Sequence, residues 1–283
     1  MLVIRNIIMD KNIYPQVSVI VPCYNQGKYV REALESVKNQ TFFDLECIIV
    51  NDGSTDNSLE EIQDFCKSDN RFIYYDKQNE GVAVARNYAI THSRGRFILP
   101  LDADDKIAPE FIQEAVDVFN CRPNVKLVYS KVLLFGYVNR EFKLPEYDYS
   151  RLLCSNHIVC TAMYRRSDYN NTDGYNPNLI GWEDWDFWLS LLKPDDIVYR
   201  IDKFLFYYRI KKSSRNSNAD KSISQIRKQI WENHKYLYSE TYMDPTLCEE
   251  YRRVVDSYEY KVGLLLLKPF RFILSFLRKI CRD

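Results

Sequence analysis

Three carboxylates stand within four residues, directly after a short apolar run. The run is Phe97–Leu101, and Asp102, Asp104 and Asp105 follow it. Adjacent like charges repel, and their burial is costly unless a positive charge lies between them. Carboxylate oxygens suit hard divalent ions such as Mg²⁺ or Mn²⁺, which also bind substrate phosphates. The pattern is therefore typical either of a metal site at a strand end or of a solvated acidic turn before the helix expected from Pro109.

A second acid, Asp52, follows the apolar run Leu45–Val50 and precedes Gly53. Glycine lets the backbone approach a ligand closely, and a carboxylate at a strand end can accept hydrogen bonds from a ribose or a nucleobase. Arg86 lies in the helix expected at 82–93, and its planar guanidinium matches a diphosphate. The plainer alternatives are an ordinary Asp-Gly turn and a surface ion pair.

The segment Gly181–Trp188 contains three of the four tryptophans and three acids. An acid beside an aromatic surface can have its pKa raised toward neutrality, which suits a general base. Aromatic faces also bind sugar rings. As structure alone, Trp185 and Trp188 would be the buried face of a helix, and Glu183 and Asp186 its first-turn acids. We expect both interpretations to hold.

Apolar runs and helical periodicity alternate along the first hundred residues, and short connections join them. This alternation predicts an α/β fold with a mostly parallel sheet, flanked by helices, and a helical extension at the C-terminus. Ligands of such sheets bind beyond the carboxyl ends of the strands, where the acids above would lie. Strands are expected at 17–21, 45–50, 71–75, 97–101, 125–130, 158–164 and 205–210. Helices are expected at 29–37, 58–67, 82–93, 109–120 and 184–192, and from 223 onward.

Composition excludes several classes of protein. The 283 residues carry 39 Lys+Arg and 39 Asp+Glu, so no net field attracts nucleic acid. The eight cysteines are scattered without a CxxC pair, as small buried residues in a reducing compartment would be. GxGxxG, P-loop and HExxH motifs are absent, which argues against a dinucleotide-binding fold, a P-loop enzyme and a zinc hydrolase. We expect neither a signal peptide nor a membrane span.

Five motifs, taken in order, resemble the inverting glycosyltransferases of family 2, which have a GT-A type fold. They are Val19–Asn25, Val50–Asp56, Gly81 through Ala85–Asn87, Leu101–Asp105 and Trp182–Asp184. Each motif alone is weak, whereas five in this order are specific. The resemblance implies a glycosyltransferase domain over 14–215, a helical extension over 216–261 and a terminal helix over 262–283.

The resemblance also implies a role for each of these residues. Asp52 is expected to contact the nucleobase, while Asp104 and Asp102 hold a Mn²⁺ or Mg²⁺ ion beside the diphosphate. Asp184 is expected to be the catalytic base, which deprotonates the acceptor hydroxyl as it attacks the anomeric carbon. The donor-binding residues implied are Pro22, Tyr24, Asn25, Asp52, Arg86, Asp102, Ala103 and Lys211. The residues implied on the sugar and acceptor side are Trp182 and Glu183.

One position departs from the family pattern. In such enzymes a histidine that touches the metal or the phosphates often follows the Tyr-Arg of the last strand. Here Tyr208 and Arg209 are followed by Ile210 and Lys211. A protonated lysine cannot ligate a metal, so Lys211 or its neighbour Lys212 is expected to meet the diphosphate directly. The third protein ligand of the metal stays open.

The function expected from the resemblance is inverting transfer of a sugar from a nucleotide-sugar, with UDP favoured, to a glycan or polyprenyl-linked acceptor in cell-surface polysaccharide synthesis. Two alternatives stay open. A non-catalytic nucleotide-sugar or lipid-binding subunit would be free to lose Asp104 and Asp184. A nucleotidyltransferase would carry a Gly-rich basic loop after the first strand, which is missing. The sequence does not identify the sugar, base, acceptor or oligomeric state.

The C-terminal tail has a distinct pattern. On a helix, a basic stripe that includes Lys268, Arg271 and Arg278 faces one side, and leucine, phenylalanine and isoleucine residues fill the rest. This pattern is typical of a helix that lies in an anionic membrane surface, although a helix packed on the domain or on a second copy would fit as well. We therefore expect a cytoplasmic protein, peripheral on the inner face of the cell membrane.

Overall fold

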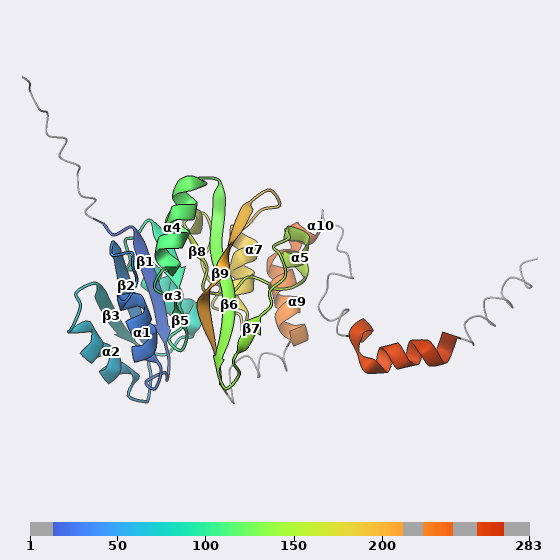
Figure 1. The fold of residues 1–283 in the computed structure, drawn as a ribbon, viewed down its shortest axis with the longest axis horizontal. Helices are drawn as coiled ribbons and strands as arrows, with labels where there is room; N and C mark the ends of the chain where they lie inside the picture. The colour runs from blue at the N-terminus through green and yellow to red at the C-terminus, as the bar shows by residue number, and fades with distance from the viewer. Residues whose placement is uncertain (1–13, 212–222, 240–253, 269–283) are drawn as a thin grey trace, which may run out of the picture.

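The computed structural model describes residues 14–211, 223–239 and 254–268, and one nine-stranded sheet forms the centre of this part of the chain (Figure 1). The first elements are β1 (Val17–Cys23), α1 (Val30–Lys38), β2 (Leu45–Asp52), α2 (Ser58–Cys66), β3 (Phe72–Lys77), α3 (Val82–Thr91), β4 (Phe97–Pro100), β5 (Lys106–Ile107) and α4 (Phe111–Cys121). They are followed by β6 (Val125–Gly136), β7 (Arg140–Phe142), α5 (Tyr149–Cys154), β8 (Met163–Arg165), α6 (Arg166–Tyr169), α7 (Glu183–Leu191), β9 (Ile197–Ile210), α9 (Ile223–Asn233) and α10 (Lys235–Ser239).

The strand order is β3-β2-β1-β4-β8-β6-β9-β5, and β7 pairs with β6. The first four strands in this order are mutually parallel. β8 is antiparallel to β4 and to β6, whereas β6 and β9 are parallel over their whole length. The expected parallel sheet is thus found in the N-terminal half, and the C-terminal half is mixed.

Burial explains why the N-terminal strands form. Every residue of β1 and of β2 is buried, as expected for parallel strands covered on both faces. One hydrophobic core lies between the sheet and α1, α2 and α4. A second core lies on the opposite face, where α3, α5, α7 and α9 pack. Helices therefore cover both faces of the sheet (Figure 1).

The last three expected strands differ most in length from the structure. β9 begins at Ile197 instead of residue 205. The sequence does not indicate this earlier start, because the first half of the strand is only partly buried and has no continuous apolar run. β6 continues past Ser130 to Gly136, where it turns into β7. β8 is restricted to Met163–Arg165, since the residues that precede it form a buried loop.

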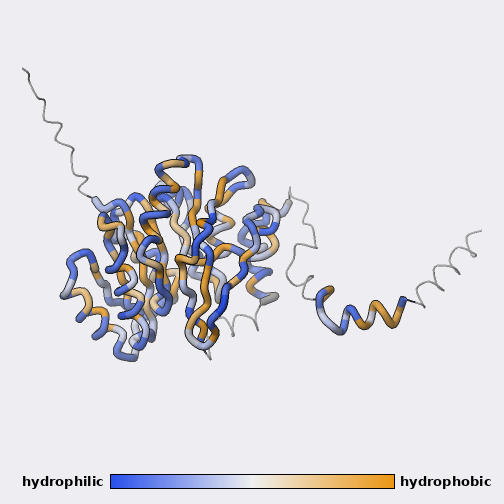
Figure 2. The backbone as a smooth tube through the Cα atoms, in the orientation of Figure 1, coloured by the Kyte–Doolittle hydropathy of each residue, from blue (hydrophilic) through white to orange (hydrophobic). Residues whose placement is uncertain are grey.

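Further helical segments follow β9 in the described part of the chain. Ile226 and Ile230 of α9 are buried in the second core, so this helix packs on the sheet domain. Residues 258–268 are helical, and hydrophobic residues follow one another near their end (Figure 2). Most of the expected terminal helix, residues 269–283, lies outside the described residues. None of the helices in the described part of the chain is long and apolar enough to cross a bilayer.

Candidate active site

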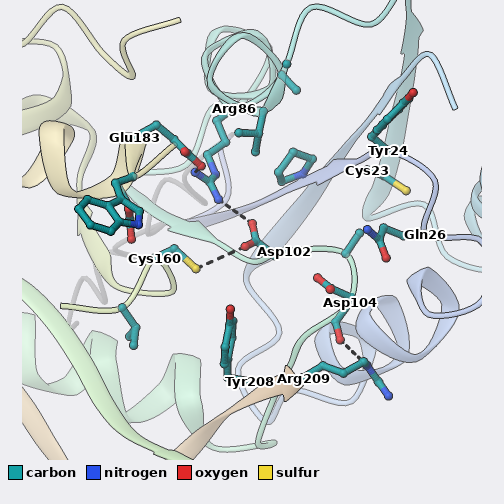
Figure 3. A pocket seen from close by; sticks show the side chains of 18 of the residues that line it. Cys23, Tyr24, Gln26, Arg86, Asp102, Asp104, Cys160, Glu183, Tyr208 and Arg209 are labelled. Atoms are coloured by element: carbon teal, nitrogen blue, oxygen red, sulfur yellow. Dashed lines mark hydrogen bonds and ion pairs between the residues drawn. The ribbon is translucent and has the colours of Figure 1, made fainter. Parts of the chain in front are cut away.

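A cleft of about 850 Å³ opens where β1, β2 and β4 end (Figure 3). Segments far apart in the sequence line it, including the loop after β1, the start of α3, the start of α7 and the end of β9. The candidate residues from the sequence all line this one cleft: Pro22, Tyr24, Asn25, Asp52, Arg86, Asp102, Ala103, Asp104, Trp182, Glu183, Asp184 and Lys211. The fold thus brings them together, and their roles stay predictions.

The loop after β1 is tied to the loop after β2. Asn25 has a left-handed backbone with φ of 53°, which asparagine tolerates better than most residues. Its Oδ1 accepts a hydrogen bond from the backbone N–H of Thr55 (2.7 Å), and its own N–H donates to Ser54 Oγ (3.0 Å). These two bonds fix the cleft wall on which Tyr24 is half exposed.

Asp52 is buried and accepts three hydrogen bonds. Its Oδ1 accepts from Lys77 Nζ (3.0 Å) and from the backbone N–H of Glu80 (3.1 Å). Its Oδ2 accepts from the backbone N–H of Gly81 (2.9 Å), a residue with φ of 94°. The carboxylate therefore holds the turn that leads into α3, in addition to lining the cleft.

Arg86 of α3 lies between two acids from different parts of the chain. Its Nη2 donates to Asp102 Oδ1 (2.6 Å), and its Nη1 donates to Glu183 Oε1 (2.8 Å). The guanidinium is buried beside the ring of Tyr175, 5.3 Å from its centroid. Burial lowers the pKa of Arg86, but the charges of the two acids outweigh burial and raise the pKa well above its usual value. Arg86 thus joins the loop after β4 to the start of α7.

The acidic loop after β4 places Asp102 and Asp104 in the lining of the cleft and Asp105 in the protein interior behind them. Asp105 is buried; its Oδ1 accepts from the backbone N–H of Arg209 (2.7 Å), and its Oδ2 has no hydrogen-bond partner among the described residues. Asp102 Oδ2 also accepts a bond from Cys160 Sγ (3.6 Å) (Figure 3). One ligand atom from each of Asp102, Asp105 and Cys160 lies within 4.8 Å of the others.

This loop fits a divalent cation. Burial, and then the neighbouring acids, raise the pKa of Asp104 and raise that of Asp105 well above its usual value. Carboxylates that are this costly to ionise are stabilised by a cation, and the buried Asp105 Oδ2 lacks a partner among the described residues. The donor set is rich in oxygen, which suits Mn²⁺ or Mg²⁺.

Asp104 is engaged by the lysine at the end of β9. Lys211 Nζ forms an ion pair with Asp104 Oδ2 (2.6 Å) and donates to Gln26 Oε1 (2.7 Å). The neighbouring Arg209 donates to the backbone carbonyl of Asp104 (2.7 Å) and pairs with Glu32. Lys211 and Arg209 therefore both bind Asp104, Lys211 through the carboxylate and Arg209 through the backbone carbonyl.

Asp184 lies in the first turn of α7 and lines the same cleft as Asp102 and Asp104 of the acidic loop. Trp182 precedes the helix in a left-handed conformation, with φ of 57° and ψ of 35°. The Asp184 carboxylate accepts from its neighbour's backbone N–H at Trp185 (2.9 Å) and from Asn156 Nδ2 (3.0 Å). Burial, with the charge of Glu183, raises the pKa of Asp184 to about 6, against the opposing effect of Arg86. A carboxylate with this pKa suits a general base near neutral pH.

Sequence reasoning did not place several residues in this cleft. Gln26 accepts a hydrogen bond from Lys211, Asn156 donates one to Asp184, and Cys160 donates one to Asp102, whereas the sequence indicates Cys160 only as a small buried residue. Arg209 follows Tyr208 in the Tyr-Arg pair, which was a usable signal. The other three carry no local signal, because their places in the cleft depend on long-range packing.

Comparison with known proteins identifies the family. A family profile described as "Glycosyl transferase family 2" matches residues 18–179. An uncharacterized glycosyltransferase of Methanocaldococcus jannaschii is 31% identical over 254 residues, which cover 83% of this chain and 84% of the relative. TuaG of Bacillus subtilis, named for teichuronic acid biosynthesis, is 31% identical over 243 residues, which cover 83% of this chain and 93% of the relative. The chain belongs to glycosyl transferase family 2.

Solved structures of glycosyltransferases share its fold. The crystal structure of S. aureus TarS with UDP-GlcNAc superposes with a TM-score of 0.66 at 22% identity, over 77% of this chain and 66% of that one. Mannosyltransferase PcManGT from Pyrobaculum calidifontis, in complex with GDP-Man and Mn²⁺, gives a TM-score of 0.65 at 16% identity, over 96% of this chain and 82% of that one. The expected GT-A type fold is confirmed.

Proposed function

We propose that this glycosyltransferase transfers a sugar from a nucleotide-sugar to a hydroxyl of a glycan or polyprenyl-linked acceptor, with inversion, in cell-surface polysaccharide synthesis. The observation that carries the proposal is that the acidic loop, through Asp102 and Asp104, and Asp184 line the same cleft. Inversion by a single in-line displacement needs a base on the acceptor side and neutralised charge on the leaving diphosphate. The name of TuaG supports the polysaccharide context.

On the donor side, Asp52 contacts the nucleobase, and the acidic loop lies at the diphosphate. Asp104 and Asp102 would hold a Mn²⁺ or Mg²⁺ ion, which when bound supplies positive charge to the departing diphosphate. UDP is the favoured nucleotide; the UDP-GlcNAc complex of TarS supports this choice, and the GDP-Man complex of PcManGT keeps a guanine nucleotide in the test. Arg86 acts on the diphosphate through Asp102, because Asp102 and Glu183 already bind both of its terminal nitrogens.

On the acceptor side, Asp184 accepts the proton of the attacking hydroxyl. Asn156 donates a hydrogen bond to one oxygen of this carboxylate and so fixes the orientation of the group. The ring of Trp182 lines the cleft next to Asp184 and offers an apolar face to a sugar ring. Glu183 pairs with Arg86 and so fixes the position of the donor-side loop relative to α7, the helix that carries Asp184.

The donor assignment predicts the effect of Asp52→Ala. The substitution should weaken binding of the nucleoside diphosphate by about 1–3 kcal/mol, because buried N–H donors of the turn before α3 and of the base would lose their acceptor. Titration calorimetry with UDP and with GDP measures this change, and Asp76→Ala on the neighbouring β3 serves as the control. An unchanged dissociation constant would mean that Asp52 holds the turn before α3 and does not bind the nucleotide.

The reaction itself is tested with a panel of nucleotide-sugars. The donor should raise the melting temperature of the protein in the presence of Mn²⁺, since ligands that bind the folded state stabilise it. With a suitable acceptor, release of free nucleoside diphosphate supports transfer. Release of pyrophosphate instead would identify a nucleotidyltransferase, and stabilisation without turnover would favour a non-catalytic binding subunit.

We also propose that the chain binds the anionic inner face of the cell membrane through its C-terminal residues. Leu265, Leu266 and Leu267 are exposed on a helical segment, and basic residues follow them in the sequence. Full-length protein should sediment with vesicles that contain anionic lipid at low salt, and a chain that lacks 262–283 should not. Equal binding to neutral vesicles, or none to either, would contradict the proposal.

A further inference from the structure

Lys211 places a positive charge at the end of β9, between two loops of the cleft. Lys211 Nζ lies 2.6 Å from Asp104 Oδ2 and 2.7 Å from Gln26 Oε1, and it lies 4.8 Å from the centroid of the Tyr29 ring. Its side chain is only 21% exposed, and that of Asp104 is 22% exposed. A single ammonium thus connects the strand end to the acidic loop and to the loop after β1.

An ammonium at contact distance from Asp104 Oδ2 repels a divalent cation that binds the same carboxylate. A protonated lysine has three donors and no lone pair, so it cannot serve as a metal ligand. It is nevertheless a full positive charge at contact distance from Asp104. A metal ion at this carboxylate must therefore displace the ammonium or bind against its repulsion.

Of the two described cations at this strand end, Lys211 is the one whose charged partner is a carboxylate of the acidic loop. Arg209 is held by the carbonyl of Asp104 and by Glu32, so its guanidinium is fixed on the side of α1. Lys211 has a flexible four-carbon side chain, and one of its partners, Gln26, is neutral. Phosphate oxygens form stronger, charge-assisted bonds with an ammonium than an amide oxygen does.

We infer that Lys211 competes with the divalent cation for Asp104, and that a nucleoside diphosphate relieves the competition by drawing the ammonium onto its phosphate oxygens. This inference rests on the proposed nucleotide-sugar transferase function. It adds an order of ligand binding to that function: the metal binds weakly to the free enzyme and tightly to the enzyme that already holds the nucleotide. Because linkage is reciprocal, bound metal raises the affinity for the nucleotide by the same factor.

The test measures Mn²⁺ affinity, without turnover. Free Mn²⁺ is followed by electron paramagnetic resonance with the full-length protein, in the absence and in the presence of saturating UDP or GDP. Lys211→Met should bind Mn²⁺ alone about tenfold more tightly than the unchanged protein, the scale of one charge removed at short range. The factor by which the nucleotide improves Mn²⁺ binding should shrink correspondingly.

Lys203→Met is the matched control. Lys203 lies on the same strand, pairs with Glu114 and does not line the cleft, so its removal should leave both Mn²⁺ affinities unchanged. Lys211→Gln provides a second, uncharged variant if the methionine variant unfolds at a lower temperature. It should show the same tighter binding.

Each result has a distinct meaning. If Lys211→Met and Lys211→Gln bind Mn²⁺ alone no better than the unchanged protein, while nucleotide still binds, the competition is refuted and the proposed function stands. An unchanged coupling factor would refute the role of the nucleotide in the same way. If no nucleoside diphosphate binds with or without Mn²⁺, both the proposed function and the inference fail.

Discussion

Replacement of Asp184 by asparagine should lower the turnover of sugar transfer by at least about a hundredfold, the usual scale of a lost general base. An amide cannot accept the proton of the acceptor hydroxyl, although it fills the same space beside Asn156. Affinity for the donor should change little, because the residues assigned to the donor are Asp52 and the acidic loop, and not Asp184. Turnover is measured as release of nucleoside diphosphate at saturating donor and acceptor.

Asp186→Asn is the matched control on the same helix. Asp186 is buried but does not line the cleft; it accepts hydrogen bonds from His234 (2.9 Å) and Asn233 (3.0 Å) of the C-terminal helical segment. Its substitution should lower the melting temperature and leave turnover of the folded protein nearly intact. If Asp184→Asn transfers sugar normally, or loses donor affinity instead, the base lies elsewhere.

The pH dependence supplies a second check on the same residue. A base must be ionised to act, and the pKa of Asp184 is raised to about 6 by its burial and by Glu183. The ratio kcat/KM should therefore be constant above this pKa and fall as the pH drops through it, by about tenfold per pH unit below. Asp184→Asn should lack this acidic limb. A limb that persists in the variant would assign it to another group.

Replacement of Asp104 by asparagine should nearly abolish transfer, and so should chelation of divalent ions. The substitution removes a charged oxygen from the acidic loop and also removes the partner of Lys211. The loss of this oxygen should weaken metal binding, and with it the positive charge that the metal would supply to the departing diphosphate. The measurement is turnover with EDTA and after a return of Mn²⁺ or Mg²⁺.

The control for this substitution is Asp64→Asn, which changes an exposed carboxylate paired with Arg31 on the surface of α2. It should retain full turnover and full response to metal. Full activity of the unchanged protein in EDTA would remove the metal from the mechanism. Full activity of Asp104→Asn would move the metal to the other acids of the loop.

The N-terminal half of the fold could be predicted from the sequence because its strands are buried on both faces. Such strands appear as continuous apolar runs, and β1 and β2 have no exposed residue. The acids that follow these runs were predicted to meet, since parallel strands end at the same edge of a sheet. This reasoning placed Asp52, Asp102 and Asp104 near one another without any knowledge of the side-chain contacts.

The C-terminal half could not be predicted as well. β9 is half exposed over fourteen residues, and its pairing with β6 is set by contacts remote in sequence. The same limit applies within the site. The sequence gives no sign that Arg86 pairs with Asp102 and Glu183, because these partners are 16 and 97 residues away in the chain. The proximity of Cys160 to Asp102 likewise follows from tertiary packing alone.

Among the described residues, two that are not glycine have a left-handed backbone, Asn25 and Trp182, and both line the cleft. For a residue as large as tryptophan this conformation costs about 1–3 kcal/mol, which the surrounding packing must offset. A glycine at 182 would relax the backbone and remove the aromatic ring next to Asp184. The same ring packs against Trp185, so the side chain that lines the cleft also helps to offset the strain of its own backbone. Stabilising substitutions are better sought away from these two turns.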